Sequence, residues 1–299
     1  MFFMKRKKLE EQILAGDIQH TGYYKDAFMR LKKNKIVMAC LIFIGLLVLS
    51  ALLAPVIAPH DPDEQNYEAV LQKASPRYLL GADEFGRDIL SRIIYGGRVS
   101  FSVGLLTQLF ASLIGITLGA IAGYNGGWID AVISRIMEIF SAFPDLLLAM
   151  GIMFVIGPGV ANVFIALALL SWVSIARLIR GQVLQLKETE YIEAARVCGA
   201  SGFWIILKHM LPNCVSTIIV MVTLGIPNAI MSEASLSFLG LGIQPPIASW
   251  GAMISAAQPY IGYRPWYSIF PGIAIILTVI AFNIFGDGLR DALDPKLRN

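Results

Sequence analysis

Residues 190–213 read Glu-Tyr-Ile-Glu-Ala-Ala-Arg-Val-Cys-Gly-Ala-Ser-Gly-Phe-Trp-Ile-Ile-Leu-Lys-His-Met-Leu-Pro-Asn. This stretch is polar and lies between two long apolar runs. Thr189 suits the N-cap of a short helix, and Glu190 follows in the first turn, where the helix dipole favours an acid. Gly199 is expected to end that helix, and Pro212 to restart the chain before the next apolar run. The stretch therefore predicts a short, well-delimited helical element between two membrane spans.

The predicted helix carries mostly small side chains, namely Ala194, Ala195 and Cys198. A partner could therefore approach its backbone closely. Glu193 and Arg196 add two charges that such a partner could contact. These features indicate a docking element rather than a plain connection between spans.

The spacing of this stretch resembles the EAA loop of ABC importer permeases, in which Glu-Ala-Ala is followed by a spaced glycine and then by Leu-Pro. In that family the loop docks on the ATPase subunit. An apolar residue usually stands where this chain has His209, but the peptide/nickel subfamily is similar to it in having His-x-Leu-Pro-Asn. The resemblance implies a coupling loop over residues 187–213. Its expected ATPase-coupling residues are Glu193, Ala194, Ala195, Arg196, Gly199, His209, Leu211 and Pro212.

Composition independently indicates a membrane protein. Of 299 residues, 56% are hydrophobic and only 15% are charged, whereas soluble domains carry about 25% charged residues. A net charge of +3 is too small to argue for nucleic-acid binding. The chain also lacks a Walker A motif, a nucleophile elbow and a dinucleotide-binding glycine motif. We therefore expect no catalytic residues, no enzyme activity and no cofactor bound by this chain.

Neither a disulfide framework nor a metal site is expected. The cysteines have no metal-type spacing, and the histidines are scattered along the chain. These residues are Cys40, Cys198, Cys214, His20, His60 and His209.

The apolar runs predict an all-α membrane protein with six transmembrane helices. An apolar run of 23 residues can cross a hydrocarbon core of about 30 Å. With the resemblance, this implies the type I ABC importer permease fold, with a permease domain over residues 36–299. The expected spans are residues 36–58, 99–123, 131–156, 160–179, 214–233 and 270–285.

Basic residues predict the orientation of the chain. Most of its 24 Lys and Arg fall in a basic N-terminal arm (residues 1–35), around the coupling loop and at the C-terminal end. Because cytoplasmic segments carry an excess of Lys and Arg, both termini and the coupling loop are expected in the cytoplasm. The expected location is a cytoplasmic (inner) membrane of bacterial type.

The loop after the first span contains Leu80-Gly-Ala-Asp-Glu-Phe-Gly-Arg-Asp-Ile-Leu-Ser-Arg92. It resembles a signature of C-type peptide permeases. We interpret it as a glycine turn and an amphipathic interfacial helix whose Ile89 and Leu90 face the membrane. Two roles stay open, contact with a substrate-delivery protein and a purely structural role. The candidate residues of this external collar are Asp83, Gly86, Arg87 and Asp88.

Two acidic residues are candidates for the pathway. Asp145 lies about 15 Å of helix inside the third predicted span, where an ionisable group by default marks a pathway. The rival interpretation is that Pro144 breaks the helix and Asp145 binds the freed backbone donors. Glu233 would lie near the external end of the fifth span, either as a pathway residue or as an interfacial carboxylate.

A row of small residues marks the second span. Gly115, Gly119 and Gly123 are four apart, and Ala111 extends the row. Such a stripe lets another helix approach closely. We expect that neighbour to belong to the same chain, with dimerisation as the alternative.

The resemblance covers nearly the whole chain and implies one permease subunit of an ABC importer for di- or oligopeptides. It further implies a homologous second permease, two ATP-binding subunits that hold ATP and Mg²⁺, and an extracytoplasmic solute-binding protein. An importer of nickel or another small solute uses similar motifs. A stand-alone secondary transporter or a channel-forming protein remains an alternative from another class. The sequence does not identify the substrate.

Overall fold

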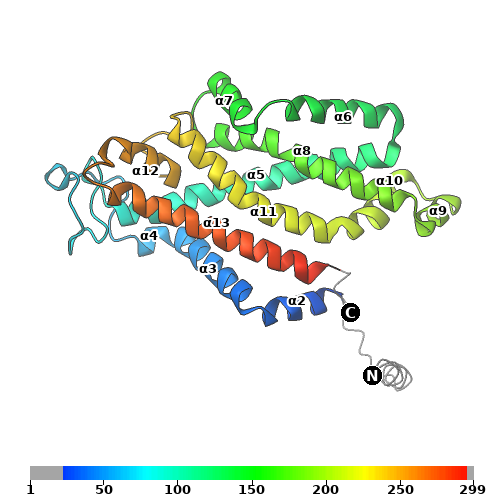
Figure 1. Cartoon of the computed structure of the whole chain (residues 1–299), viewed down its shortest axis with the longest axis horizontal. Helices are drawn as coiled ribbons and strands as arrows, with labels where there is room; N and C mark the ends of the chain where they lie inside the picture. The colour runs from blue at the N-terminus through cyan, green and yellow to red at the C-terminus, as the bar shows by residue number, and fades with distance from the viewer. Residues whose placement is uncertain (1–22, 295–299) are drawn as a thin grey trace, which may run out of the picture.

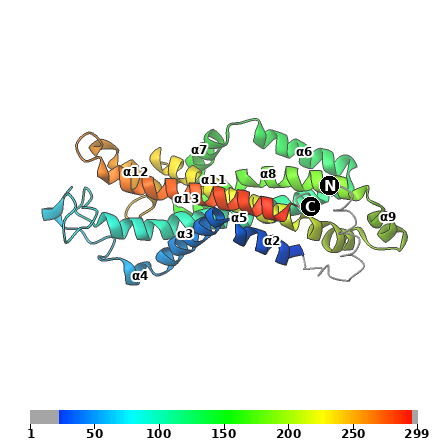
Figure 2. The same ribbon diagram turned by 60° about the horizontal axis from the view of Figure 1, so that its bottom comes forward.

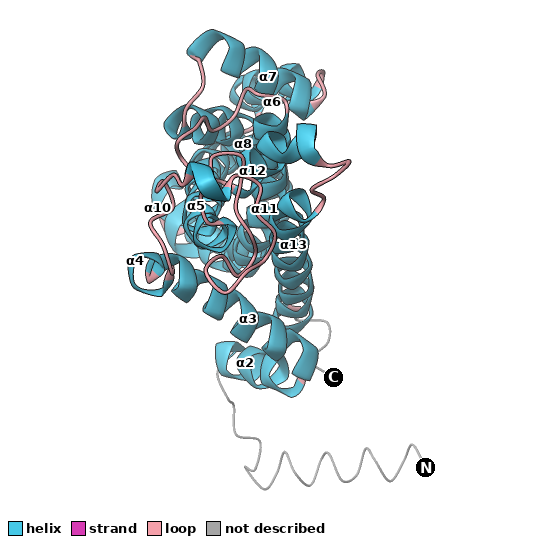
Figure 3. Ribbon diagram, turned by 90° about the vertical axis from the view of Figure 1, so that its left-hand side faces the viewer, coloured by secondary structure: helices cyan, strands magenta, loops and turns pink. Residues whose placement is uncertain are grey.

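The computed structural model describes residues 23–294, and this part of the chain is helical without a β-strand (Figures 1 and 3). Among the described residues, five helices are long and apolar enough to cross a membrane, and the count is six if a bent pair of helices is taken as one span. The expected all-α architecture is therefore confirmed. The helices are α2 (Tyr23–Lys33), α3 (Lys35–Leu52), α4 (Ala54–Ile57), α5 (Ile89–Asn125), α6 (Gly127–Ser141), α7 (Asp145–Ile156), α8 (Val160–Lys187), α9 (Glu190–Val197), α10 (Gly202–Ile205), α11 (Leu211–Phe238), α12 (Trp250–Ala257) and α13 (Trp266–Leu293).

The two ends of the molecule differ (Figures 1 and 2). At one end lies α9, and the described N- and C-terminal segments lie in the same half of the molecule. The opposite end carries α12 and the loop between α4 and α5. The first part of the basic arm, residues 1–22, lies outside the described residues, as do residues 295–299.

Helices α5 and α8 form the centre of the bundle, and their contact depends on the row of small residues. A Cβ atom added to Gly119 would lie 2.5 Å from the carbonyl oxygen of Ala176 on α8. One added to Gly115 would lie 2.8 Å from the carbonyl oxygen of Trp172, also on α8. The stripe therefore packs within the chain, as expected. The adjoining core includes Ile175 and Ile179.

The third span, expected over residues 131–156, is not one continuous helix. Helices α6 and α7 are bent by 89° at a short break. Pro144 is the N-cap of α7 and has extended backbone angles, φ −58° and ψ 130°. A proline cannot donate a backbone hydrogen bond and disfavours helical geometry in the residue before it. These effects end α6 and restart the chain in a new direction.

The second span begins ten residues earlier than expected, because α5 is continuous from Ile89. No separate interfacial helix precedes it. Asp88 caps α5, and its carboxylate accepts a hydrogen bond from the backbone N–H of Ser91 at 2.9 Å. Ile89 is fully buried, so the prediction that it faces the membrane is wrong. It packs instead on Met253 and Tyr267 at the α12–α13 end of the bundle.

The fourth and fifth spans are longer than expected. Helix α8 continues beyond residue 179 to Lys187, and an unbroken helical run joins residues 202 and 238 through one π turn at Ile206–Met210. Pro212 lies in the first turn of α11, where its missing N–H costs little, and it does not interrupt the run. The prediction that it restarts the chain is therefore wrong. The connection between α8 and α11 is mostly helical.

The sixth span, α13, is also longer than residues 270–285. It runs beside α11 and α3 and carries α12 against its first half (Figure 1). Near its C-terminal end, a Cβ atom added to Gly288 would lie 2.4 Å from the side chain of Val37 on α3. The first and last spans therefore pack closely together.

Candidate functional site

Helix α9 projects from one end of the bundle (Figure 1). It begins after Thr189, whose backbone is extended, and it carries Glu190 and Glu193 in its first turn. Gly199 follows it with a φ of +83°, a conformation that glycine adopts without strain. The sequence therefore predicted both ends of this helix correctly.

One side of α9 is anchored to the bundle. Ile192 of α9 is fully buried in the core around α5 and α8, and so are Ile205 of α10 and Met210 of the π turn that follow it. The guanidinium of Arg196 stacks over the ring of Tyr124, 5.4 Å from its centroid, at the end of α5. These contacts attach α9 to both α5 and α8.

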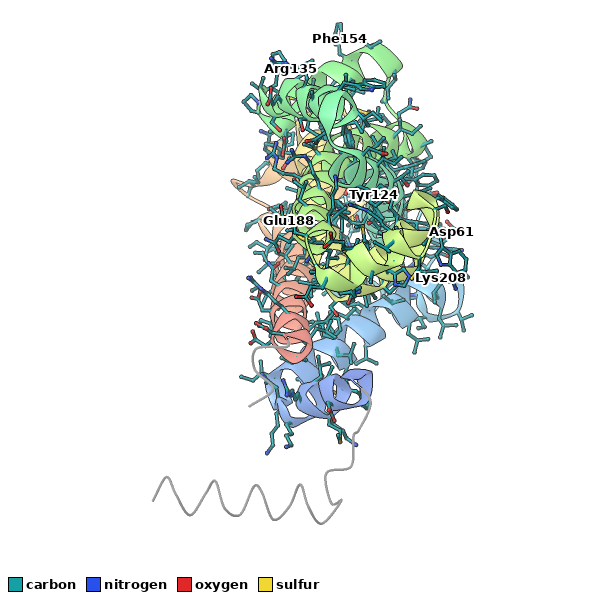
Figure 4. The ribbon with its side chains drawn as sticks, turned by 90° about the vertical axis from the view of Figure 1, so that its right-hand side faces the viewer. Asp61, Tyr124, Arg135, Phe154, Glu188 and Lys208 are labelled. Atoms are coloured by element: carbon teal, nitrogen blue, oxygen red, sulfur yellow. The ribbon has the colours of Figure 1, made fainter. Side chains whose placement is uncertain are left out.

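The other side of α9 is open. The side chains of Glu193 and Ala194 are exposed, and Val197 is 83% exposed. Figure 4 looks onto this end of the molecule, where Glu188 and Lys208 are labelled on the segments around α9. The exposed side combines an acid, small residues and an apolar residue, which gives a partner both charge and a close approach.

The remaining predicted coupling residues lie apart from α9, where α11 begins. His209 lies within the π turn, and its carbonyl oxygen accepts a hydrogen bond from the side-chain amide of Asn213 at 2.6 Å. Leu211 and Pro212 form the start of α11. The predicted coupling residues therefore divide into a projecting group on α9 and a group that enters the fifth span.

An ion pair that sequence analysis missed joins the bent pair of helices to α8. The guanidinium of Arg180 donates two hydrogen bonds to the carboxylate of Asp130 on α6, the second at 2.6 Å. At the other end of α6, Arg177 donates to the hydroxyl of Ser141 at 2.8 Å. No sequence signal could have paired Asp130 with Arg180, because the two residues are 50 positions apart.

Three cavities follow one another along α11. We call the cavity nearest α9 the inner cavity and the one farthest from it the outer cavity. The inner cavity measures about 700 Å³ and is lined by Gln182, Asn213, Ser216, Thr217 and Arg290 among others. The central cavity measures about 640 Å³ and is lined by Gln108, Ser141, Asp145, Arg177, Asn228 and Ser232 among others. The outer cavity measures about 470 Å³ and is mainly apolar, with Ala234, Phe238, Ile254 and Ile275 in its lining.

Neighbouring cavities share apolar residues. Met221 and Leu224 line both the inner and the central cavity. Leu146 and Met231 line both the central and the outer cavity. The central cavity is thus bounded on each side by two apolar side chains.

Asp145 lies at the break between α6 and α7. It occupies the first turn of α7, and its exposed side chain lines the central cavity. No hydrogen bond from a freed backbone N–H to this carboxylate occurs among the described residues. Pro144 does break the helix, but the interpretation that Asp145 binds the freed donors is therefore wrong.

Glu233 is inside the protein, not at an interface. Its carboxylate is fully buried and accepts hydrogen bonds from Ser237, Ser249 and Ser100, at 2.7, 2.9 and 3.3 Å. It is absent from the linings of all three cavities. The expected interfacial position is wrong, because α5, α11 and the segment before α12 close around this residue.

The collar residues are held by internal contacts. The carboxylate of Asp83, which is fully buried, accepts a hydrogen bond from Arg87 Nε at 2.6 Å. Asp88 is 2% exposed, and at Gly86 an added Cβ atom would lie 1.8 Å from the carbonyl oxygen of Asn66. These side chains shape the loop, and its exposed surface comes from other residues such as Tyr67, which is 73% exposed.

Among the described residues, no group of three or more His, Cys, Asp and Glu side chains is arranged to hold a metal ion.

Comparison with known proteins gives two family matches. Residues 115–299 match the family described as binding-protein-dependent transport system inner membrane component. Residues 22–76 match the N-terminal transmembrane domain of oligopeptide transport permease C. The first match contains residues 187–213 and every cavity-lining residue except Gln108.

Relatives match over nearly their full length. A dipeptide transport system permease protein of Bacillus subtilis is 46% identical over 93% of this chain and 87% of its own. A glutathione transport system permease protein of Pectobacterium atrosepticum is 43% identical over 92% of each chain. The same fold occurs in a solved structure of an inward-facing methionine ABC transporter, with a TM-score of 0.58 at 20% identity over 69% of this chain and 98% of the other. The chain therefore belongs to the family of binding-protein-dependent transport system inner membrane components.

Proposed function

We propose that this chain is a membrane-spanning subunit of an ATP-driven importer of di- or oligopeptides. The observation that carries the proposal is a helix, α9, that is anchored on one side and open on the other, at the end of a path of cavities. Relatives named for dipeptide and oligopeptide transport support the substrate class. The polar and charged lining of the central cavity suits a peptide better than an apolar solute.

The open side of α9 docks on an ATPase subunit in this proposal. Glu193 and Arg196 contact the ATPase, and the small Ala194 and Ala195 permit a close approach. Two ATP-binding subunits hold ATP and Mg²⁺, and this chain contributes no catalytic group. The exposed side chains of α9 and the resemblance to the EAA loop support this assignment.

The position of the chain ends relative to α9 supports an orientation of the chain in the membrane. The ends of the described chain lie in the same half as α9 (Figure 1), and that half also carries much of the basic charge. The positive-inside rule supports a cytoplasmic location for both termini and α9. The loop between α4 and α5 then faces outward, where a solute-binding protein docks and delivers the substrate.

A second, homologous permease completes the path. The central cavity is open on one side in the single chain, since Asp145 and Arg177 both line it and are exposed. Charged side chains are costly against lipid. A partner permease that covers this side supplies the opposite wall and keeps lipid away from the two charges.

Transport proceeds by movement of α8 and α11. Closure of the ATPase pair displaces α9, and the buried Ile192 transmits the displacement to the core around α8. The movement separates Leu146 of α7 from Met231 of α11, while Met221 and Leu224 keep the inner side of the central cavity closed, and the cavity opens outward. ATP hydrolysis reverses the movement and opens the path to the cytoplasm.

Purification with partners tests this function. The chain is tagged in its native host, gently solubilised with its membranes, and the co-purifying proteins are identified by mass spectrometry. We expect a second permease and two ATP-binding subunits, with crosslinks to an ATPase through a cysteine at position 193. Purification of the chain without ATPase subunits, or peptide uptake that depends on an ion gradient and not on ATP, would contradict the proposal.

A further inference from the structure

Two opposite charges line the central cavity from different helices. Asp145 comes from the first turn of α7, and Arg177 comes from α8. The other polar side chains of the lining carry no charge, namely Gln108, Ser141, Ser171, Ser174, Asn228 and Ser232. The cavity therefore presents one negative and one positive group across a neutral polar wall.

These two charges are not paired with each other or with another charge. Within the described residues, neither Asp145 nor Arg177 takes part in an ion pair. Neighbouring charges behave differently, since Arg180 is paired with Asp130 and Arg135 with Glu138. Unpaired charges in a membrane-spanning chain are costly against lipid, and they mark a position that binds a charged group.

The basic group is held in place. Arg177 donates a hydrogen bond through Nη2 to the hydroxyl of Ser141 at 2.8 Å, and that hydroxyl donates in turn to the carbonyl oxygen of Met137. The other donors of the guanidinium are free of protein partners, because no other hydrogen bond of Arg177 occurs in the described chain. A planar guanidinium with open donors suits a carboxylate.

The acidic group is held by the backbone. The 89° bend after α6 places Asp145 at the start of α7, and Pro144 fixes the backbone before it. Its carboxylate can accept several hydrogen bonds and has no donor among the described residues. An ammonium group carries three donors and a positive charge, which matches this acceptor.

We propose that the central cavity binds a dipeptide in its zwitterionic form, with Asp145 contacting the α-ammonium group and Arg177 the α-carboxylate. The inference rests on the proposed function and adds the groups of the substrate that the permease itself recognises. The side chains of the peptide then face Leu146, Leu170 and the neutral polar wall. Recognition of the two termini, and not of the side chains, lets the cavity accept peptides of varied sequence.

The size of the cavity is consistent with this ligand. Its volume of about 640 Å³ falls within the usual range for small-ligand sites, about 300–1,000 Å³. The two apolar pairs, Met221 with Leu224 and Leu146 with Met231, bound it on either side. With the partner permease over the open side of the cavity, a peptide held by its termini between these pairs is separated from both aqueous compartments.

Uptake by the complete transporter tests the inference. The permease pair, the ATPase subunits and the solute-binding protein are reconstituted in liposomes, with labelled alanyl-alanine as the substrate at saturating binding protein. Asp145→Asn and Arg177→Gln are each expected to reduce ATP-dependent uptake at least about tenfold, since each removes a charge-assisted hydrogen bond. ATP hydrolysis stimulated by the loaded binding protein should stay within about twofold of the unmodified complex.

Two kinds of matched variant separate charge from structure. Asp145→Glu and Arg177→Lys keep the charges and should retain most of the uptake. Arg135→Gln and Glu138→Gln remove charges from the exposed ion pair on α6, outside the cavity, and should leave uptake unchanged.

Three outcomes overturn the inference. The first is near-normal uptake in Asp145→Asn and Arg177→Gln. The second is an equal loss in the variants that keep the charges. The third is a loss of stimulated ATP hydrolysis together with uptake, which would assign the two residues to assembly or coupling. Failure of the proposed function can be told apart from failure of this inference, because in the first case even the unmodified complex would show no ATP-dependent uptake of alanyl-alanine.

Discussion

Arg180 of α8 and Asp130 of α6 form a bidentate ion pair that attaches the bent pair of helices to the centre of the bundle. The two side chains are partly buried, with 30% and 18% of their surfaces exposed. A bidentate pair of this kind is stronger than a single hydrogen bond and also defines orientation. It therefore sets where α6 stands relative to α8, and with it one wall of the central cavity.

Replacing Asp130 by Asn should destabilise the attachment of α6. The neutral amide can accept only part of the bidentate contact, and we expect a loss of about 1–3 kcal/mol in the free energy of unfolding. Thermal unfolding of the purified protein measures it in a double-mutant cycle with Arg180→Gln. The equivalent cycle on Arg135 and Glu138, which are 77% and 61% exposed, should give little coupling. Additive effects of Asp130→Asn and Arg180→Gln would show that their contact contributes nothing.

Replacing Gly119 by Ala should separate α5 from α8. The added methyl group would stand 2.5 Å from the carbonyl oxygen of Ala176, and backbone atoms cannot move aside as a flexible side chain can. Overpacking of this kind costs about 1–3 kcal/mol. Gly151→Ala is the matched control, since nothing lies within 4 Å of its added Cβ atom. Equal melting temperatures for the two variants would contradict the close contact of α5 and α8.

The stability of the protein is expected to depend on which residue replaces Glu233. Glu233→Gln keeps one carbonyl oxygen as an acceptor, whereas Glu233→Leu leaves the hydroxyls of Ser100, Ser237 and Ser249 without one. Because each unsatisfied buried polar group costs about 1–3 kcal/mol, the leucine variant should be the less stable by about 2 kcal/mol or more. Thermal unfolding of the two variants measures the order. A leucine variant as stable as the glutamine variant would mean that the three serines do not depend on this carboxylate.

Replacing Glu193 by Lys should abolish ATP-dependent uptake without unfolding the chain. The side chain is exposed, and its replacement leaves no hydrogen-bond partner unpaired, so the melting temperature should change little. The reversed charge would repel the surface on which α9 docks. Glu138→Lys, an exposed charge reversal on α6 outside the three cavities, is the control. Normal uptake in Glu193→Lys would remove the coupling role assigned to this residue.

Shortening Met221 to Ala should weaken the apolar pair between the inner and central cavities. We expect an ATP-independent leak of alanyl-alanine into proteoliposomes that exceeds the leak of the unmodified complex. Ile219→Ala is the control, because Ile219 lies on the same helix and lines none of the three cavities. An unchanged leak in Met221→Ala would show that this side chain does not close the path.

The sequence by itself determined the features that depend on local chemistry. Long apolar runs predicted the membrane spans, Gly199 predicted the end of α9, and the row from Gly115 to Gly123 predicted a close helix contact. Each follows from composition, helix propensity or spacing over one or two turns. Local rules also located Pro144 as a possible break, but they could not give the 89° bend that it produces.

Only the tertiary structure decided which distant residues meet. The place of Glu233 near the end of a span left a pathway and an interfacial position open, but the residue is buried, because Ser100 of α5 and Ser249 before α12 join Ser237 of its own helix around the carboxylate. The pairing of Asp130 with Arg180, and the meeting of Asp145 and Arg177 in one cavity, depend on how α6, α7 and α8 pack. These contacts arise from the relative placement of whole helices, which no local pattern of residues encodes.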